Sequence, residues 1–423
     1  MDNLSSTSRS RVIPSGEVLI LRHTSKVCIV CAWSPSASII SAGPDDFYIR
    51  TISDESGGSR PQCDHSEVLE YVPAHQGQSY IAALDWNKEG TLLATGFAGQ
   101  ARIWSIHGEL IRTFSGHTDT ILTLKWNKAS TYIVTGGSEG TTIVWSDETS
   151  EPVQQFNDHS DRVLGVDWLN ELTFATCSGD CEIHVFTIGV SQPIMTISGH
   201  QGPVNCVKWD PTGSLLASCS NDHAVKIWRM GQAECVHNFT EHEQAVNVIQ
   251  WSPTGPGTTN PNQRSILASG SDDGTVKLWD IEQGELLCSL DAGLWDPINS
   301  LAFSPNGEYV VSGAGQQINI WSVTDKQVIR FYTNDDESGS ASDDVPGTAT
   351  CVCWNENGDK VAAGFTNGTV HVFSFRMRAN RVDLGARCRA DMEIIADDAK
   401  KEMRRIGRSF EGYAIVEEFL KWL

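Results

Sequence analysis

The chain has 423 residues, 40% of them hydrophobic and 20% charged, and its formal net charge is −22 at pH 7. An acidic surface repels a phosphate backbone, so direct, sequence-specific binding of DNA or RNA is not expected. No apolar run approaches the roughly 18 residues of a membrane-spanning helix. The N-terminus also lacks the apolar core of a signal peptide, so membrane insertion and secretion are both disfavoured.

Residues 1–16 are rich in serine, and they are predicted to form a disordered tail. The segment from Glu17 to Leu21 that follows is apolar apart from its first residue and is typical of a β-strand. Turn-rich composition and many glycines continue from there to residue 375. Residues 17–375 are therefore predicted to be β-structure throughout.

One strand position recurs eight times along this stretch and carries tryptophan in seven of the eight copies. These residues are Trp33, Trp86, Trp126, Trp168, Trp209, Trp251, Phe303 and Trp354. A second landmark is an acid six residues before an aromatic that ends an alternating run, as in Asp222 to Trp228 and Asp180 to Phe186. A third is a histidine nine residues before the recurring tryptophan, at His117, His159, His200 and His242.

Three landmarks that agree on a period of 40 to 53 residues indicate an internal repeat. A histidine early and a tryptophan late in each copy are typical of WD40 repeats, in which each copy is a four-stranded blade that stacks on its neighbours. The fold class predicted from the sequence is therefore all-β, an eight-bladed WD40 β-propeller. Three copies put Ala98, Gly315 and Asn367 at the acid position, and we expect those blades to be less rigid.

The recurring histidine, acid and tryptophan are predicted to form a structural network inside each blade. A hydroxyl on the second strand would accept from the tryptophan and contact the histidine, which would contact the acid. The residues assigned to this network are His117, Glu139, Trp145, His200, Ser218, Asp222, Trp228, His242, Asp273 and Trp279. Recurrence in several blades favours this structural interpretation over a catalytic one, because an active site is unique.

Three insertions interrupt the repeats. Residues 53–68 and 255–265 are rich in glycine, proline and asparagine and are predicted to be turn-rich loops. Residues 334–344 form an acidic run with interleaved serines. We interpret this run as a solvated loop, with a phosphorylated interaction loop as the alternative.

The C-terminal tail, residues 376–423, does not resemble a blade. Between Ala390 and Ile406 apolar residues fall at helical spacing, which predicts an amphipathic helix. The last repeat ends at Phe373 without an outer strand of its own. Because an unpaired edge is a liability, we expect the N-terminal strand to complete the last blade and close the ring.

Peptide-binding residues are expected at the mouth of the central channel. Two repeat positions should face it, namely the residue four before the strand tryptophan and the residue just before the turn acid. These rim residues are Ser138, Asn205, Asn221, Asn247, Asp272 and Asn299. Amides and acids suit the backbone and basic side chains of a peptide, although asparagine and aspartate also cap turns.

Charge is distributed unevenly along the chain. The tail from Arg376 onward has 11 basic and 9 acidic residues, whereas the rest has 20 basic and 44 acidic ones. Basic peptides such as histone tails would be attracted to such a surface. The alternative is that the acids only keep the protein soluble.

No cofactor, metal site or catalytic residue is predicted. The cysteines lie in apolar strands, where Cys28 and Cys31, or Cys351 and Cys353, are badly spaced for tetrahedral convergence on zinc. Reduced core thiols are expected instead. The segment Gly136 to Gly140 matches a G-x-S-x-G pattern, but it is expected to be a turn between strands, without the helix that a nucleophile elbow requires. The chain is therefore not expected to be an enzyme.

The amino-acid sequences of four segments in the repeats indicate a more specific family. Lys208 to Ser220 and Trp251 to Asn262 resemble the transducin beta-like WD-repeat subunits of nuclear receptor corepressor complexes, as do Leu124 to Lys128 and Gly358 to Val361. The resemblance covers residues 17–375. It implies an eight-bladed ring in the nucleus, joined to corepressor proteins and a class I histone deacetylase, with affinity for histone tails. Family members also carry an N-terminal LisH helix pair and an F-box-like segment, neither of which is recognisable in residues 1–16.

Two functions from different classes follow. The first is a non-enzymatic nuclear corepressor scaffold that binds histone tails or partner peptides. The second is a substrate receptor for a ubiquitin ligase, or a cytoplasmic assembly platform. The resemblance favours the first.

Overall fold

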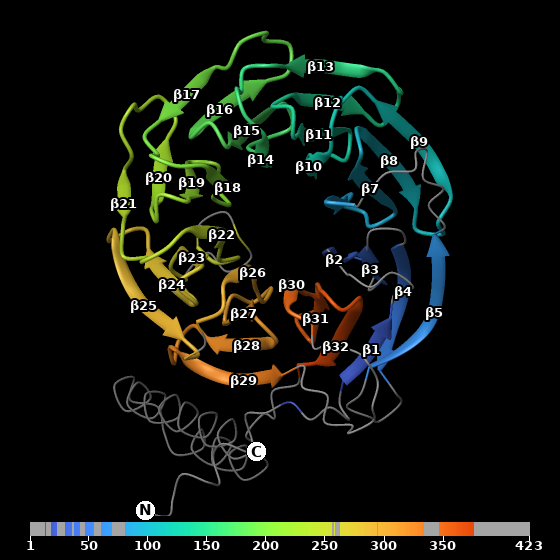
Figure 1. The fold of residues 1–423 in the computed structure, drawn as a ribbon, viewed down its shortest axis with the longest axis vertical. Coiled ribbons are helices and arrows are strands. Elements are labelled where there is room, and N and C mark those ends of the chain that lie inside the picture. Colours follow the sequence, from blue (N-terminus) through green and yellow to red (C-terminus); the bar gives the residue numbers. More distant parts are fainter. Residues whose placement is uncertain are drawn as a thin grey trace, which may run out of the picture. The chain divides into compact units, whose positions relative to one another are not determined.

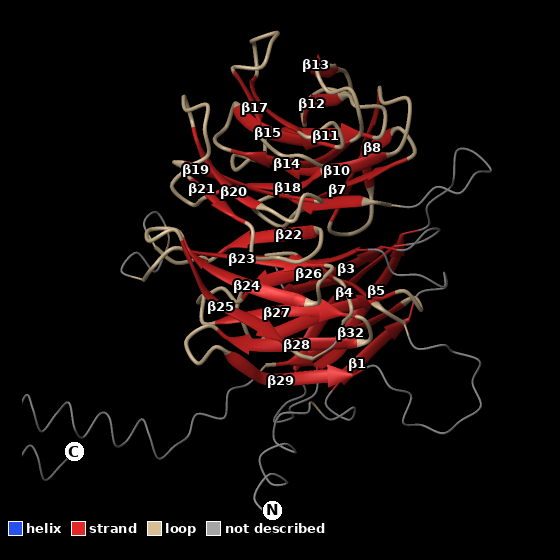
Figure 2. Cartoon of the chain, turned by 60° about the vertical axis from the view of Figure 1, so that its left-hand side comes forward, coloured by secondary structure: helices blue, strands red, loops and turns tan. Residues whose placement is uncertain are grey.

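The computed structural model describes residues 13, 18–22, 30–35, 38–42, 47–54, 61–69, 81–255, 258, 263–293, 295–333 and 347–375. All regular elements within these residues are β-strands, which form eight four-stranded antiparallel sheets. Figure 1 shows the sheets side by side around a ring, and Figure 2 shows strands joined by loops. The all-β propeller expected from the repeats is confirmed. No helix in the described part of the chain is long and apolar enough to span a membrane.

Three predicted features fall outside the described residues. They are the C-terminal tail 376–423 with its helix, the acidic segment 334–344, and the N-terminal tail 1–16 except for residue 13. That one residue, Ile13, is buried, and its N–H donates to the carbonyl of Phe331 at 2.9 Å.

We number the sheets in chain order of their innermost strands. Sheet 1 contains β2 (Val30–Trp33), β3 (Ser38–Ala42), β4 (Phe47–Asp54) and β5 (Pro61–Leu69). Sheet 2 contains β6 (Ala83–Trp86), β7 (Leu92–Phe97), β8 (Gln100–Ser105) and β9 (Leu110–Ser115). Sheet 3 contains β10 (Ile121–Trp126), β11 (Tyr132–Gly137), β12 (Thr142–Ser146) and β13 (Pro152–Phe156). Sheet 4 contains β14 (Val163–Trp168), β15 (Thr173–Ser178), β16 (Glu182–Thr187) and β17 (Met195–Ser198).

The second half of the ring repeats the pattern. Sheet 5 contains β18 (Val204–Trp209), β19 (Leu215–Ser220), β20 (Val225–Arg229) and β21 (His237–Phe239). Sheet 6 contains β22 (Val246–Trp251), β23 (Ile266–Ser271), β24 (Thr275–Asp280) and β25 (Glu285–Asp291). Sheet 7 contains β26 (Ile298–Phe303), β27 (Tyr309–Ala314), β28 (Gln317–Ser322) and β29 (Gln327–Thr333). Sheet 8 contains β30 (Ala349–Trp354), β31 (Lys360–Phe365), β32 (Thr369–Ser374) and β1 (Val18–Arg22).

The first strand closes the ring by completing the last sheet. β1 pairs antiparallel with β32, from Val18 opposite Phe373 to Arg22 opposite Thr369. This agrees with the pairing expected from the missing outer strand of the last repeat. Because β31 pairs with the other side of β32, this contact leaves β32 without a free edge.

The recurring tryptophan ends the innermost strand of its sheet, and in sheets 3 to 6 its indole or its backbone N–H donates to the preceding sheet. The indole Nε1 of Trp168 donates to the carbonyl of Lys125 at 3.1 Å, and that of Trp251 donates to Lys208 at 2.9 Å. The backbone N–H of Trp209 donates to the carboxylate of Asp167 at 2.8 Å. These bonds run between adjacent sheets and fix their register around the ring.

The hydrophobic core lies between neighbouring sheets, because each sheet presents apolar residues on both of its faces. One cluster combines Ile103 and Phe114 of sheet 2 with Ile143 and Trp145 of sheet 3. The rings of Phe114 and Trp145 stack with their centroids 5.0 Å apart. A blade removed from its neighbours would expose both faces, which explains why the repeats fold only as a set.

One predicted loop is partly wrong. Residues 61–68, expected to belong to a turn-rich insertion, form most of the outer strand β5. The turn-forming residues are concentrated at Gly57 and Gly58, in the segment 55–60 that the structure does not describe. Polar residues beyond them were mistaken for loop, although an outer strand of a propeller has one solvated face and tolerates them. The second insertion, 255–265, contributes no strand in its described residues.

Candidate functional site

The histidine, acid, hydroxyl and tryptophan side chains meet in one buried chain of hydrogen bonds in sheets 5 and 6. In sheet 6, Nδ1 of His242 lies 2.7 Å from Asp273 and Nε2 lies 2.8 Å from the hydroxyl of Ser269. Trp279 donates from Nε1 to the same hydroxyl at 2.8 Å. Asp273 also accepts the backbone N–H of Glu243 and of Thr275. The chain thus joins the loop before the sheet, two of its strands and the turn between them.

Sheet 5 repeats this geometry with different residues. His200 lies 2.8 Å from Asp222 and 2.7 Å from the hydroxyl of Ser218, which accepts from Trp228 at 2.8 Å. In sheet 3 His117 contacts Glu139 and lies 2.7 Å from Thr135, to which Trp145 donates at 2.9 Å.

Sheet 4 has the same network without the indole. His159 lies 2.9 Å from Asp180 and 2.8 Å from the hydroxyl of Thr176. Phe186 takes the place of the tryptophan and is fully buried. The hydroxyl therefore has one partner fewer than in sheets 3, 5 and 6.

Sheets 2 and 7 keep only part of this arrangement. Trp104 donates to Thr95 at 3.0 Å, and Trp321 donates to Ser312 at 2.9 Å. The acid position is Ala98 in sheet 2 and Gly315 in sheet 7. Neither residue can supply the carboxylate that Asp273 supplies in sheet 6, and His75, the histidine of this repeat in sheet 2, lies outside the described residues.

Burial and charge set the protonation of these groups. Burial lowers the pKa of His117 and of His242, although the carboxylates of Glu139 and Asp273 act in the opposite direction. The pKa of Asp273 is lowered, because the hydrogen bonds from His242 and Thr275 outweigh its burial. Hydrogen bonding to His159 likewise outweighs burial and lowers the pKa of Asp180 to about 2. In sheet 6, where both shifts are downward, a neutral His242 beside an ionised Asp273 is favoured at neutral pH, which suits a fixed structural bond.

The rim residues of sheets 5 and 6 form matched pairs. The amide of Asn205 donates to the side chain of Asn221 at 2.7 Å and to the carbonyl of Val246 at 2.9 Å. In sheet 6 the amide of Asn247 donates to Asp272 at 2.7 Å. The two positions that the sequence assigned to the rim are thus adjacent in space in both sheets.

The remaining rim residues are placed differently. Asn299 of sheet 7 is exposed, with its Oδ1 3.4 Å from Nδ2 of Asn247, so it extends the sheet 6 pair to the next sheet. Ser138 lies in the turn between β11 and β12, where its N–H donates to the carbonyl of Thr120 at 2.9 Å. A strand and not a helix follows this turn, so the G-x-S-x-G segment makes no nucleophile elbow.

Sequence reasoning missed a structural property of the first rim position. The register shifts at this residue in sheets 3 to 8, so that it forms a β-bulge on the innermost strand. Bulges re-aim a side chain. The residues at the bulge are Leu122, Leu164, Asn205, Asn247, Asn299 and Thr350. Two leucines in sheets 3 and 4 and three asparagines in sheets 5 to 7 divide the rim into an apolar half and an amide half.

The two leucines could have been found by the same four-residue offset that found the asparagines. A search for polar residues alone at that offset does not find the apolar half. Both leucines are partly exposed. A peptide across this rim would meet aliphatic side chains on one side and amide or acid groups on the other.

Three cysteines come closer together than the spacing within each strand predicted. The sulfur of Cys31 lies 3.2 Å from that of Cys351 and 3.7 Å from that of Cys353, because sheets 1 and 8 are neighbours. Hydrogen bonding to these two thiols, together with burial, raises the pKa of Cys31, which favours the protonated thiol over a metal-binding thiolate. In the part of the chain that the structure describes, no group of three or more His, Cys, Asp or Glu residues could hold a metal ion.

Comparison with known proteins agrees with this architecture. The family "WD domain, G-beta repeat" matches seven stretches: residues 66–105, 108–146, 150–187, 191–229, 233–280, 284–322 and 339–374. The first stretch begins within β5, so most of sheet 1 lies outside the match. The crystal structure of the C-terminal WD40 domain of Sif2 superimposes with a TM-score of 0.70, covering 85% of this chain and 99% of that one. Its sequence identity is 21%, and this likeness concerns the fold alone.

Sequence relatives narrow the family further. The WD40 repeat-containing protein HOS15 of Arabidopsis thaliana is 47% identical over 88% of this chain and 60% of its own length. The F-box-like/WD repeat-containing protein TBL1X of Mus musculus is 44% identical over 86% of this chain and 68% of its own length. This chain thus spans about three fifths to two thirds of these relatives, and it belongs to the WD-repeat family and, within it, to the transducin beta-like group that includes TBL1X.

Proposed function

We propose that this chain is a non-enzymatic scaffold in the nucleus and a subunit of a transcriptional corepressor complex. In this proposal its rim binds histone tails or peptides of corepressor proteins, and the complex contains a class I histone deacetylase. The observation that carries the proposal is the polar half of the rim, where Asn205 with Asn221 and Asn247 with Asp272 form adjacent pairs. Similarity to TBL1X and HOS15 supports the corepressor setting.

The chemistry of the paired groups suits peptide recognition. An amide both donates and accepts, so it can pair with the N–H and C=O groups of an extended backbone. Asp272 adds a negative charge for a basic side chain. The partly exposed Leu122 and Leu164 would receive aliphatic side chains of the same peptide. In this proposal all eight sheets act as blades of one ring, with the seven matched repeats completed by sheet 1.

Affinity purification from nuclear extract tests this function. The parent chain is compared with a rim variant that carries Asn205→Ala, Asn221→Ala, Asn247→Ala and Asp272→Ala, and co-purifying proteins are identified by mass spectrometry. We expect corepressor and deacetylase subunits on the parent chain and their loss from the rim variant. A matched control replaces exposed polar residues at the other end of sheets 5 and 6 by alanine, at Gln232, Glu234, Glu282 and Gln283.

The melting temperature of each variant must be measured beside the purification, because Asn205 also bonds to the backbone of sheet 6. A folded rim variant that retains all partners would show that binding lies elsewhere. Absence of corepressor subunits from the parent chain itself, with cullin-type ligase subunits in their place, would favour the alternative of a ubiquitin-ligase substrate receptor.

A further inference from the structure

A pocket of about 220 Å³ lies at one end of sheet 6, beside the rim. Its lining comes from the loop before β22, the turn between β23 and β24, the strands β24 and β25, and the loop after β25. The lining residues are Glu243, Asp273, Thr275, Lys277, Ser289, Asp291 and Trp295. Asp273 directly follows the rim residue Asp272, so the pocket and the amide half of the rim share one turn.

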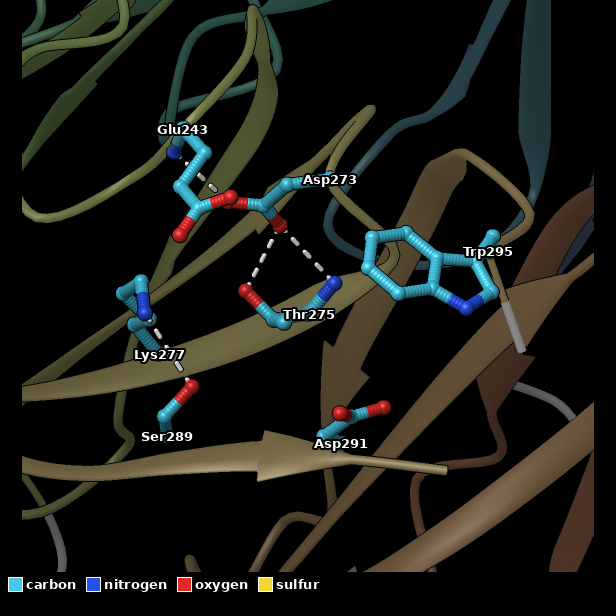
Figure 3. A pocket seen from close by; sticks show the side chains of 7 residues that line it. All are labelled: Glu243, Asp273, Thr275, Lys277, Ser289, Asp291 and Trp295. Carbon is cyan, nitrogen blue, oxygen red and sulfur yellow. Dashed lines mark hydrogen bonds between the residues drawn. The ribbon is translucent and has the colours of Figure 1, made fainter. Parts of the chain in front are cut away.

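Trp295 forms one wall of the pocket although its surface is 87% exposed. The tryptophans of the described strands are buried or partly buried, whereas this loop indole is exposed. Figure 3 shows Trp295 and Asp291 on one side of Thr275, with Glu243 and Lys277 on the other. A large exposed indole at the edge of a cavity is an available contact surface, because burying it against water is favourable.

The pocket has an excess of negative charge. Three carboxylates, from Glu243, Asp273 and Asp291, face one ammonium, from Lys277. Lys277 is buried as a residue, and its ammonium donates to the hydroxyl of Ser289 at 3.1 Å. A cation would therefore be attracted to this pocket and an anion repelled.

The carboxylates differ in what they still offer. Asp273 is fully engaged, since one oxygen accepts from His242 and Glu243 and the other accepts twice from Thr275. It contributes charge but no free acceptor. Glu243 and Asp291 are exposed, and among the described residues their carboxylates accept a single hydrogen bond, from the N–H of Gly293 to Asp291 at 2.6 Å. They can therefore accept from a ligand.

We propose that this pocket binds an arginine side chain of a peptide, with the guanidinium stacked on the indole of Trp295 and its N–H groups donating to Glu243 and Asp291. A guanidinium is planar and weakly hydrated, so it can stack on an aromatic face while its edge donates to a carboxylate. An ammonium would supply charge without that stacking surface. This inference rests on the proposed peptide-binding function and adds the identity of one recognised side chain.

The test uses the full chain labelled with 5-fluorotryptophan and observed by 19F NMR. The chain has 14 tryptophans, and the variant Trp295→Phe assigns one resonance by its disappearance. N-acetyl-arginine amide is titrated in, with the neutral isostere N-acetyl-citrulline amide as the control compound. We expect a saturable shift of the Trp295 resonance with the arginine compound and a shift at least about fivefold smaller with citrulline at equal concentration.

A double variant and its control test the carboxylates. Glu243→Gln with Asp291→Asn should weaken arginine binding by about five- to tenfold. The matched control Glu234→Gln with Glu282→Gln also removes two charges, from exposed residues at the other end of sheets 5 and 6, and should leave binding unchanged. A melting temperature equal to that of the parent chain shows that each variant is folded.

A Trp295 resonance that does not move with arginine, or that moves equally with citrulline, overturns the pocket proposal. Neither result bears on the rim, because the purification with the rim variant tests the scaffold function without the arginine compound. Conversely, a chain that binds arginine at Trp295 but purifies without corepressor subunits supports the pocket proposal and contradicts the proposed corepressor function.

Discussion

Sheets 6 and 7 are neighbours with the same strand order, yet they are held together differently. In sheet 6 the hydroxyl of Ser269 joins Trp279 to His242, and His242 is held by Asp273. In sheet 7 the equivalent hydroxyl accepts from the tryptophan, but the acid position is Gly315. The fold therefore does not depend on the full network in every sheet.

This difference distinguishes the apolar packing that forms the sheets from the hydrogen bonds that rigidify some of them. Burial of apolar faces between sheets is common to both, as shown by the cluster that joins Leu278 and Leu290 of sheet 6 to Val310 and Trp321 of sheet 7. The hydrogen-bond network of sheet 6 adds to this apolar packing. It fixes the loop and the turn at one end of sheet 6, which is where the rim pair and the arginine pocket lie.

The largest expected effect is the loss of the acid in sheet 6. Asp273→Ala removes the partner of a buried histidine and two backbone bonds, so we expect it to lower the free energy of unfolding by about 3 kcal/mol. The matched change in sheet 8, Asn367→Ala, removes only two bonds to Thr369 and should cost about 1 kcal/mol. Urea unfolding of both variants measures the difference. Equal decreases in the free energy of unfolding would mean that the bond between His242 and Asp273 does not stabilise sheet 6.

A smaller difference is expected at the central hydroxyl. Ser269 and Ser312 are both completely buried, and each accepts from a tryptophan at 2.8 and 2.9 Å respectively. Only Ser269 also contacts a histidine. Ser269→Ala should therefore cost about 2 kcal/mol and Ser312→Ala about 1 kcal/mol. Thermal unfolding of the two variants compares them directly, and a costlier Ser312→Ala would contradict the proposed division.

Lowering the pH should destabilise the sheets that carry histidine–acid pairs before the other sheets. The folded pKa of His242 and of Asp273 lies below the unfolded value, so the unfolded chain binds more protons and stability falls as pH falls. The histidine contribution is lost as pH drops below about 6.5, and the carboxylate contribution as it drops below about 4. Hydrogen exchange at pH 7.5 and pH 5, corrected for intrinsic rates, should show protection lost in sheets 3 and 6 before sheet 7. Uniform loss around the ring would indicate global titration instead.

The repeat spacing predicted the ring and its internal bonds because both depend on periodic positions. A histidine, an acid and a tryptophan at fixed offsets must occupy the same place in each sheet that carries them, which is why His200 and His242 make equivalent contacts. The closing strand was also predictable, because a sheet that lacks an outer strand needs one from elsewhere.

The sequence did not predict features that lie outside the periodic positions of the repeats. Trp295 lies in a loop outside the repeat positions, and its exposure depends on how that loop runs past β25. The approach of Cys31 to Cys351 depends on which sheets become neighbours when the ring closes, and spacing within a strand does not contain that information. Residues 61–68 of strand β5 were predicted to be loop because they are largely polar and follow the turn-forming Gly57 and Gly58 in the sequence.

The smallest effect concerns a polar residue that sheet 7 buries without a partner. Asn319 is 1% exposed, and neither its amide nitrogen nor its oxygen has a hydrogen bond. It stands two residues before Trp321, a position that Ile143 fills in sheet 3. An unpaired buried amide is unfavourable, so Asn319→Val should raise the free energy of unfolding by about 1 kcal/mol and the melting temperature by about 1–2 °C. Asn319→Asp, which buries a charge at the same site, should lower both. A less stable valine variant would show that the amide of Asn319 has a hydrogen-bond partner such as water. Sheet 7 would then have a stabilising polar interaction of its own.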